Sequence, residues 1–179
     1  MTGAGAVYGQ ALYDLAKEEG LEQAVFEQMV MLNEVFTEQP EYLRLLSASN
    51  LPFAQKEQLI EECFGGKVEP YLNNFMKLLT RKGHIRSFPE CVKHYREQYH
   101  IARNILPVKA VTAVALTDAQ KEKLEEKLCA ITGKTAQIVN RVDPDVVGGV
   151  RLDYDGTQVD DTVTSRMQNI RKLLKNTVL

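Results

Sequence analysis

Six aspartates crowded into the last third of the sequence are the residues best suited to metal-dependent chemistry. They are Asp143, Asp145, Asp153, Asp155, Asp160 and Asp161. Carboxylates in this number could hold a divalent cation for phosphoryl transfer or hydrolysis, although no calcium-loop spacing is present. Each also has a local explanation: Asp143-Pro144-Asp145 is typical of a turn, Asp155-Gly156 of a hairpin, and Asp160-Asp161 of a helix start. We therefore expect no bound metal, with a hydrolase built on these carboxylates as the alternative.

Cysteine and histidine are the second candidates for chemistry. Cys91 and His94 stand three residues apart on a predicted helix and could form half of a zinc site. The others, Cys63, Cys129, His84 and His100, show no recognisable ligand spacing. The three scattered cysteines indicate reduced thiols. The sequence also lacks a serine-hydrolase elbow, a phosphate-binding loop and a zinc-protease motif, so we expect no catalytic residue, no metal and no cofactor.

Composition narrows the class of protein. The chain has 179 residues, of which 44% are hydrophobic and 26% charged, with a net charge of −2, as in an ordinary globular protein. Charge is uneven, because residues 1–66 hold three basic and eleven acidic side chains while residues 67–106 hold eight basic and three acidic. A nucleic-acid binder would show one dominant basic face, so we expect no nucleic acid. No apolar run approaches the ~20 residues of a membrane span, and the first ten residues do not resemble a signal peptide, so the chain is expected to stay where it is made.

Residues 1–106 show apolar positions at helical spacing throughout. The predicted helices cover residues 4–15, 21–36, 42–46, 52–64, 68–79 and 88–102. Gly20, Pro40 and Gly83 stand between them, where helices end or cannot continue. The pattern predicts an all-α six-helix bundle as the N-terminal domain.

The pattern changes after Pro107, where a small α+β domain is predicted over residues 107–179. Strands are expected at 108–115, 136–142, 148–154 and 157–159, and helices at 119–131 and 162–175. Thr117 or Asp118 is the expected cap of the first of these helices. Asp155-Gly156 is a strong signal for a two-residue hairpin turn.

The apolar face of the first helix allows two interpretations. Tyr8, Ala11, Leu12 and Leu15 recur at helical spacing, with small and large side chains mixed. This face could pack into the core, which composition favours. It could equally form the wall of a groove that accepts an amphipathic helix of another protein. Composition does not separate the two.

Three stretches together form a family pattern. They are residues 8–16 (YGQALYDLA), 112–117 (TAVALT) and 142–152 (VDPDVVGGVRL), the last followed by Asp160-Asp161-Thr162-Val163, Arg166 and Met167. This pattern resembles the delta subunit of F-type ATP synthase, whose mitochondrial relative is the oligomycin-sensitivity-conferring protein. The resemblance extends over essentially the whole chain. Asp161 stands where the family usually has glycine, a residue that tolerates positive φ.

The resemblance implies a stator role for the chain. It implies that residues 1–106 bind the N-terminal helix of an alpha subunit of the catalytic head, between the first and fifth helices. Residues 107–179 would meet the C-terminal region of the b subunit of the peripheral stalk, so that proton translocation is coupled to ATP synthesis. The groove positions in this chain would be Tyr8, Ala11, Leu12, Leu15, Leu72, Phe75 and Leu79.

The resemblance also implies a location and the absence of catalysis. The chain would be a structural subunit, not an enzyme. It would lie at the cytoplasmic face of the bacterial cell membrane, attached only through the complex. A free-standing helical adaptor is the remaining alternative.

Overall fold

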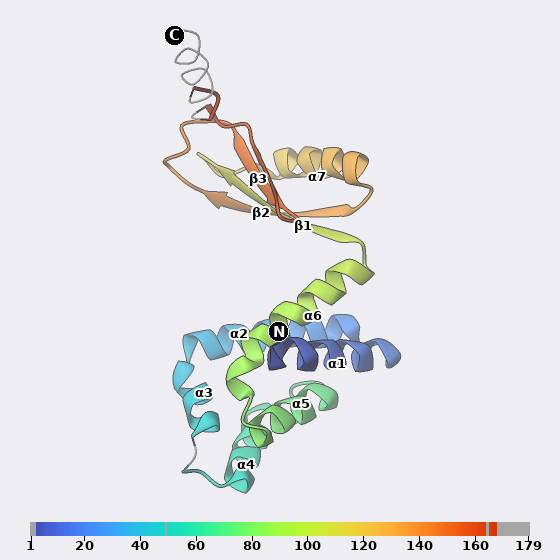
Figure 1. Cartoon of the computed structure of the whole chain (residues 1–179), viewed down its shortest axis with the longest axis vertical. Coiled ribbons are helices and arrows are strands. Elements are labelled where there is room, and N and C mark those ends of the chain that lie inside the picture. The colour runs from blue at the N-terminus through green and yellow to red at the C-terminus, as the bar shows by residue number, and fades with distance from the viewer. Residues whose placement is uncertain (1–2, 49, 164, 168–179) are drawn as a thin grey trace. The chain divides into compact units, whose positions relative to one another are not determined.

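The computed structural model describes residues 3–48, 50–163 and 165–167 (Figure 1). The chain divides into two compact units, Met1–Ile101 and Ala102–Leu179. The first unit is helical and the second is α+β, so the predicted order of a helical part followed by an α+β part is confirmed.

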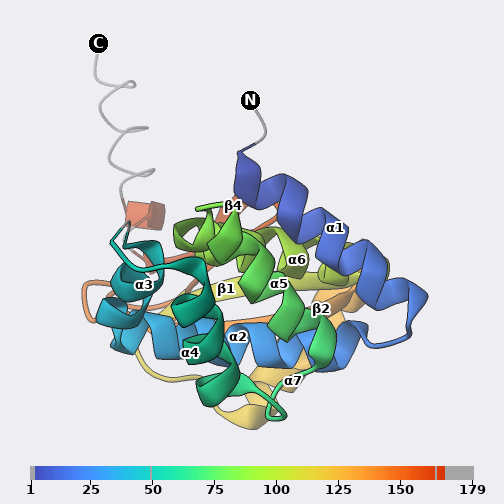
Figure 2. The ribbon, with the colours of Figure 1, turned by 90° about the horizontal axis from the view of Figure 1, so that it is seen from below.

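The helical unit consists of short helices that follow one another closely. They are α1 (Ala4–Glu18), α2 (Glu22–Glu38), α3 (Pro40–Ser47), α4 (Phe53–Phe64), α5 (Pro70–Arg81), the 3-10 turn η1 (Ile85–Ser87) and α6 (Phe88–Ala102). Pro40 and Pro70 occupy the first helical position, where the missing N–H costs nothing. Gly20 has φ 69°, a left-handed conformation that ends α1 and lets α2 turn back beside it (Figure 2).

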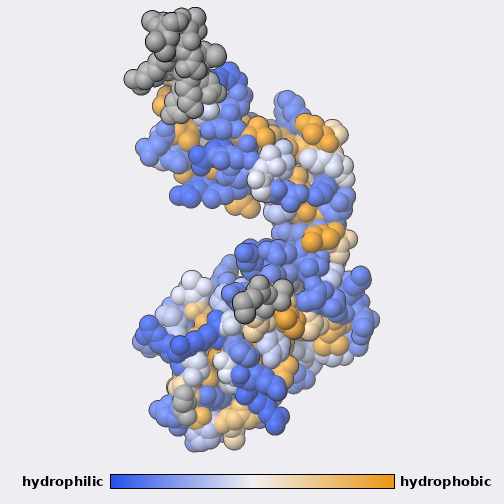
Figure 3. Space-filling view, in the orientation of Figure 1, coloured by the Kyte–Doolittle hydropathy of each residue, from blue (hydrophilic) through white to orange (hydrophobic). Residues whose placement is uncertain are grey.

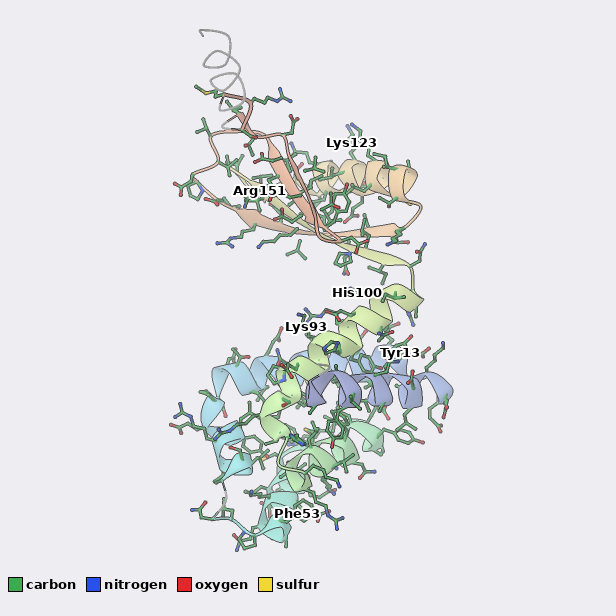
Figure 4. The ribbon with its side chains drawn as sticks, in the orientation of Figure 1. Tyr13, Phe53, Lys93, His100, Lys123 and Arg151 are labelled. Carbon is green, nitrogen blue, oxygen red and sulfur yellow. The ribbon has the colours of Figure 1, made fainter. Side chains whose placement is uncertain are left out.

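The core of this unit is built around α2 and α6. The apolar side chains of α2 that face inward, Val25, Met29, Leu32 and Phe36, are buried. From α6, the ring of Tyr95 packs edge-to-face with the ring of Tyr13 on α1, with 5.4 Å between the centroids; Tyr13 is labelled in Figure 4. The hydroxyl of Tyr95 donates to the carbonyl of Glu22, 3.0 Å away, which satisfies its polar atom inside the core. These contacts hold α1, α2 and α6 together.

The α+β unit is a four-stranded sheet with one helix. Its elements are β1 (Ile105–Thr112), α7 (Asp118–Thr132), β2 (Thr135–Val142), β3 (Val150–Tyr154) and β4 (Thr157–Asp160). The strand order is β2-β1-β3-β4, with β1 parallel to β2 and antiparallel to β3. Helix α7 packs on one face of the sheet (Figure 1). The buried cluster between them is Leu106, Val108, Ala110, Leu128, Ala136 and Leu152.

Two local predictions for this unit are confirmed. The hydroxyl of Thr117 accepts a hydrogen bond from the backbone of Gln120, whose side chain bonds back to Thr117, so Thr117 is the cap of α7. Asp155 and Gly156 have φ values of 47° and 74° and join β3 to β4 as a two-residue turn.

The predicted break at Pro107 needs correction. The division between the units falls at residues 101 and 102, and β1 begins at Ile105, two residues before the proline. Pro107 pairs only with Gln137 of β2, because the pairing of β1 with β3 begins at Lys109. A proline is tolerated in a strand where one side has no hydrogen-bonded neighbour. The strand ends at Thr112, earlier than predicted, because the Thr112 hydroxyl donates to the carbonyl of Val114 and bends the chain.

The end of the chain differs from the family pattern in a way the structure explains. Asp161 does not adopt positive φ, so the glycine usual in the family is not required at that position. Its carboxylate instead pairs with Arg166, with an N–O distance of 2.7 Å to the second oxygen. The predicted last helix, 162–175, lies mostly outside the described residues.

Candidate functional site

A hollow of about 310 Å³ lies between α1 and α5. It is lined by Tyr8, Ala11, Leu12 and Leu15 from α1 and by Tyr71, Asn74, Phe75 and Leu78 from α5. The two helices lie side by side in both ribbon views (Figures 1 and 2). The lining residues on each helix span two turns, about 10 Å along the axis. Seven of the eight are apolar or aromatic, so the hollow is an elongated apolar site between two helices.

Five of the seven predicted groove residues lie in this hollow, all four from α1 and Phe75 from α5. The other two do not. Leu72 and Leu79 are 0% exposed and belong to the core beneath α5. Their neighbours Tyr71, Asn74 and Leu78 line the hollow instead. The sequence does contain a signal for these residues, because positions 71, 74, 75 and 78 also repeat at helical spacing. Each stands one position before a residue of the buried stripe that contains Leu72 and Leu79.

The lining residues divide into a floor and two rims. Leu12 and Phe75 form the floor, because they are only 3% and 7% exposed. Leu15 on one rim and Leu78 on the other are 37% and 43% exposed, so their side chains are accessible to a partner. Ala11 is also exposed, and its small side chain leaves the space above the floor open. A partner side chain could therefore enter between the two rims.

Aromatic residues mark the two ends of the hollow. At one end, the negative charge of Glu19 and a hydrogen bond to its carboxylate raise the pKa of the Tyr71 hydroxyl. At the other end, the ring of Tyr8 lies 5.9 Å from the ring of His84, which follows α5. The C-terminal end of α1 thus meets the N-terminal end of α5, and the two helices run in opposite directions.

A larger hollow, of about 680 Å³, lies where α2 meets α3. Its lining includes Glu38, Gln39 and Glu41 beside Tyr42 and Leu45. Polar groups make up much of this lining, and the residues come from one sharp joint between consecutive helices. This hollow therefore lacks the long apolar floor that a partner helix needs.

The aspartates that suggested a metal site have separate local contacts. Asp143 accepts a hydrogen bond from the backbone of Asp145, 3.2 Å away. The hydroxyl and the backbone N–H of Thr162 donate to Asp160 and lower the pKa of that carboxyl. Within residues 3–48, 50–163 and 165–167, no three His, Cys, Asp or Glu side chains gather closely enough to hold a metal ion.

Cys91 and His94 on α6 also have surroundings that explain them without a metal site. Cys91 is fully buried, and burial raises the pKa of its thiol to about 12, so it is protonated at neutral pH. His94 Nδ1 lies 3.3 Å from the carboxylate of Glu97 one turn along the helix. This pair is part of the exposed surface of α6.

The surface of each unit is mixed in character. On the face drawn in Figure 3, hydrophobic side chains form small separate spots among hydrophilic ones. Among the helices of the described residues, none combines the length and the apolar character that crossing a bilayer demands.

Comparison with known proteins identifies the family. The family model for the ATP synthase delta (OSCP) subunit matches residues 5–174. The chain is 29% identical over 168 residues to the ATP synthase subunit delta of Moorella thermoacetica, covering 94% of each chain. It is 27% identical over 173 residues to the ATP synthase subunit delta of Enterococcus faecalis, covering 96% of each.

The fold has a relative among solved structures. The chain is similar to one in the cryo-EM structure of the Toxoplasma gondii mitochondrial ATP synthase hexamer, with a TM-score of 0.73, 15% identity and coverage of 96% of this chain and 97% of that one. At this identity the likeness concerns the fold alone.

An end-to-end family match together with a helical unit and an α+β unit in this order defines a structural subunit of a rotary ATP synthase, not an enzyme. The chain belongs to the ATP synthase delta (OSCP) family and is a stator component of F-type ATP synthase. The alternatives of an aspartate hydrolase and of a free-standing adaptor are therefore wrong.

Proposed function

We propose that this chain joins the catalytic head of F-type ATP synthase to its peripheral stalk. The helical unit binds the amphipathic N-terminal helix of an alpha subunit in the hollow between α1 and α5. The α+β unit meets the C-terminal region of the b subunit. Held in this way at the cytoplasmic face of the bacterial cell membrane, the head does not turn with the rotor, and proton translocation stays coupled to ATP synthesis.

The observation that carries this proposal is the shape and lining of the hollow. An amphipathic helix presents apolar side chains at positions i, i+3, i+4 and i+7, which form a stripe about 10 Å long over two turns. The lining of the hollow extends over the same length on each helix, with an apolar floor of Leu12 and Phe75 between the rims at Leu15 and Leu78. The apolar surface of the leucines on the two rims is unfavourable in water, and a docked helix would bury it.

The alanine on the α1 wall provides the sharpest test of this site. Ala11→Leu adds three carbons at an exposed position that lines the hollow, so it should obstruct a docked helix while leaving the core beneath intact. We expect the affinity for an alpha-subunit N-terminal peptide, measured by calorimetry on the full chain, to fall at least tenfold. The matched control is Ala54→Leu on α4, which is exposed and does not line the hollow. Equal affinity of the two variants would overturn the proposed site.

Phe75→Asp is a less informative probe, because Phe75 is only 7% exposed and forms part of the floor. A carboxylate there loses its hydration without gaining a partner, which costs several kcal/mol. The unit would then lose stability together with binding. Helicity and melting temperature must therefore be measured beside affinity for that variant.

The assignment of the stalk to the second unit has its own test. A chain that ends after Ala102 retains α1 to α6 and should still bind the alpha peptide. It should no longer bind a soluble fragment of the b subunit, whereas the full chain should bind both. If the shortened chain binds the b fragment as well as the full chain does, the stalk contact lies in the helical unit instead.

A further inference from the structure

The walls of the hollow continue past their apolar parts as charges of opposite sign. On α1, Glu18 and Glu19 stand three and four residues after Leu15. On α5, Arg81 and Lys82 stand three and four residues after Leu78. Residues at these spacings share one face of a helix, so each charged pair extends the face that lines the hollow. All four charged side chains belong to exposed residues.

The two charged pairs lie at opposite ends of the hollow, because α1 and α5 run in opposite directions. Glu19 interacts with Tyr71 at the start of α5, and Tyr8 near the start of α1 lies against His84 just after α5. The end marked by Tyr71 is therefore acidic, and the end marked by Tyr8 is basic. This difference between the ends is a property of the site, not of the net charge of the chain.

Nearby charges of the opposite sign do not cancel the acidic end. Lys17 is two residues after Leu15, which places it on the opposite face of α1. Lys67, in the turn before α5, keeps its charge but is held at the end of α4, where it donates to the carbonyl of Cys63 at 3.1 Å. The carboxylates of Glu18 and Glu19 therefore determine the charge at that end.

The basic end rests mainly on Lys82. The guanidinium of Arg81 lies over the ring of Phe53 on α4, 5.8 Å from its centroid, so this cation is turned toward α4; Phe53 is labelled in Figure 4. Glu90 of α6 packs against Gly5, on the side of α1 that faces α6. Lys82 is the residue that extends the wall of the hollow directly.

We infer that the hollow binds its helix in one direction only, selected by charge. The occupant is an amphipathic helix of the catalytic head that carries basic side chains toward the Glu18–Glu19 end and acidic side chains toward the Lys82–His84 end. This inference rests on the proposed function and adds to it the charge pattern of the partner. The apolar stripe of the partner helix supplies affinity, but it fits the hollow almost equally well when the helix is reversed. The charges at the two ends therefore determine the direction in which the helix binds.

Exposed ion pairs of this kind each change an equilibrium by about two- to fivefold. Turning the helix around replaces an attraction by a repulsion at both ends, so a preference of about tenfold or more is expected at low salt. The preference should shrink with added salt, because the Debye length falls from about 30 Å at 0.01 M to about 8 Å at 0.15 M.

The direction can be measured with one synthetic peptide. The probe is an amphipathic helix with an apolar stripe, two lysines at one end, two glutamates at the other, and a spin label beside the glutamates. Bound to the isotope-labelled full chain at low salt, the label should broaden the amide signals around His84 and spare those around Glu18. In the double variant Glu18→Lys/Lys82→Glu, each new charge is offset by the remaining Glu19 or Arg81, so the charge difference between the ends is removed and the two ends should broaden about equally. The control variant Glu34→Lys/Lys93→Glu makes the same charge changes at exposed positions away from the hollow. In this variant the broadening should stay at His84.

The possible results distinguish the inference about charge selection from the proposed binding site itself. Broadening at His84 in the unsubstituted chain that becomes about equal at the two ends in the double variant supports the inference. Equal broadening at both ends in the unsubstituted chain, or a pattern unchanged by the double variant, overturns charge selection and leaves the proposed site standing. If Ala11→Leu does not weaken binding of the peptide, the proposed site itself is wrong and the inference fails with it.

Discussion

Gly9 on α1 lies directly against the backbone of Cys91 on α6. A methyl group at Gly9 would stand 2.7 Å from the carbonyl oxygen of Cys91 and 3.2 Å from its Cα atom. One turn earlier, a methyl group at Gly5 would collide with the Cβ atom of Glu90. The two helices therefore approach closely because these α1 residues have no side chain, and the contact holds the helix that forms one wall of the hollow.

Gly9→Ala should lower the free energy of unfolding of the helical unit by about 1–3 kcal/mol, because the neighbour it meets is backbone that cannot move aside easily. The sign of this change in the free energy of unfolding is informative, because alanine in place of a glycine inside a helix would otherwise stabilise the helix by about 1 kcal/mol. Urea unfolding followed by circular dichroism measures the change. Gly3→Ala is the control, because its methyl group meets only a side-chain oxygen of Glu90 at 3.5 Å. A stabilised Gly9→Ala variant would show that the helices are not in close contact.

The boundary between the units predicts how fragments behave. A fragment of residues 1–102 should fold, and extending it to residue 106 should not stabilise it, because Leu106 belongs to the core of the other unit. Conversely, residues 107–179 should be less stable than residues 103–179 by about 2–5 kcal/mol, the usual cost of losing a buried leucine. Denaturant unfolding of the four fragments tests this. Equal stability of the two C-terminal fragments would place Leu106 outside the core.

Asn140 should be the most sensitive polar residue of the sheet. Its amide nitrogen donates to the carbonyl of Ala110 at 3.0 Å and to the hydroxyl of Thr112 at 2.9 Å, and its oxygen accepts from the backbone of Leu116 at 2.9 Å. Asn140→Ala removes all three hydrogen bonds and should cost about 1–3 kcal/mol. Asn140→Asp should cost more at neutral pH, since a carboxylate would face two oxygens.

Thermal unfolding of the two Asn140 variants and of Gln137→Ala separates this effect from a general weakening of β2. Gln137 is exposed on the same strand, so its substitution should change the melting temperature little. A melting temperature for Asn140→Ala equal to that of Gln137→Ala would mean that the hydrogen-bonded side chain adds nothing.

Asp160 should make the α+β unit sensitive to acid. Hydrogen bonds from the hydroxyl and the backbone N–H of Thr162 lower the pKa of this carboxyl below its usual 3.8. Because the ionised form is favoured in the folded state, its contribution to stability is complete above pH ~4 and is lost as the pH falls through the lowered pKa. Unfolding midpoints measured between pH 5 and 2 should therefore fall less steeply in Asp160→Asn, and part of the difference should also appear in Thr162→Val. Parallel curves for the wild type and Asp160→Asn would contradict the assignment.

We expect the aspartates to bind no metal with defined stoichiometry. Asp143 and Asp160 accept hydrogen bonds from nearby backbone, and Asp161 is paired with Arg166. Titration calorimetry with Mg²⁺, Ca²⁺ and Mn²⁺ should show only dilution heats. Micromolar binding that disappears in Asp160→Asn would require a metal-dependent role in addition to the stator role.

Local signals in the sequence predict the parts of the fold that local interactions determine. The turn at Asp155-Gly156 and the cap at Thr117 depend on residues within three positions of each other, and both are confirmed. The strand start at Ile105 was missed, because proline argues against a strand unless the strand is known to lack a neighbour on one side at that position. That information comes from the register with β3, which lies more than 40 residues away in the sequence.

On helix α5 of the candidate site, too, local sequence signals do not determine which residues face the core. Two apolar stripes overlap there, one through Leu72 and Leu79 and one through Tyr71, Phe75 and Leu78. Helical spacing identifies both stripes but does not say which one faces the core. On α1 all four predicted residues line the hollow, and the buried stripe of that helix runs beside them through Gly9, Tyr13 and Ala16.

Strand β1 also determines how the α+β unit would respond to mechanical tension. Only Arg103 and Asn104 separate the end of α6 from this strand, and β1 lies inside the sheet with β2 on one side and β3 on the other. A pull applied at Ile105 in the direction of β1 would load many of the hydrogen bonds of this strand at once in shear. It would meet the ladder to β2 first, from Ile105 onward, and the ladder to β3 from Lys109. A sustained force would thus be resisted by two ladders together, whereas an edge strand would be held by one ladder alone.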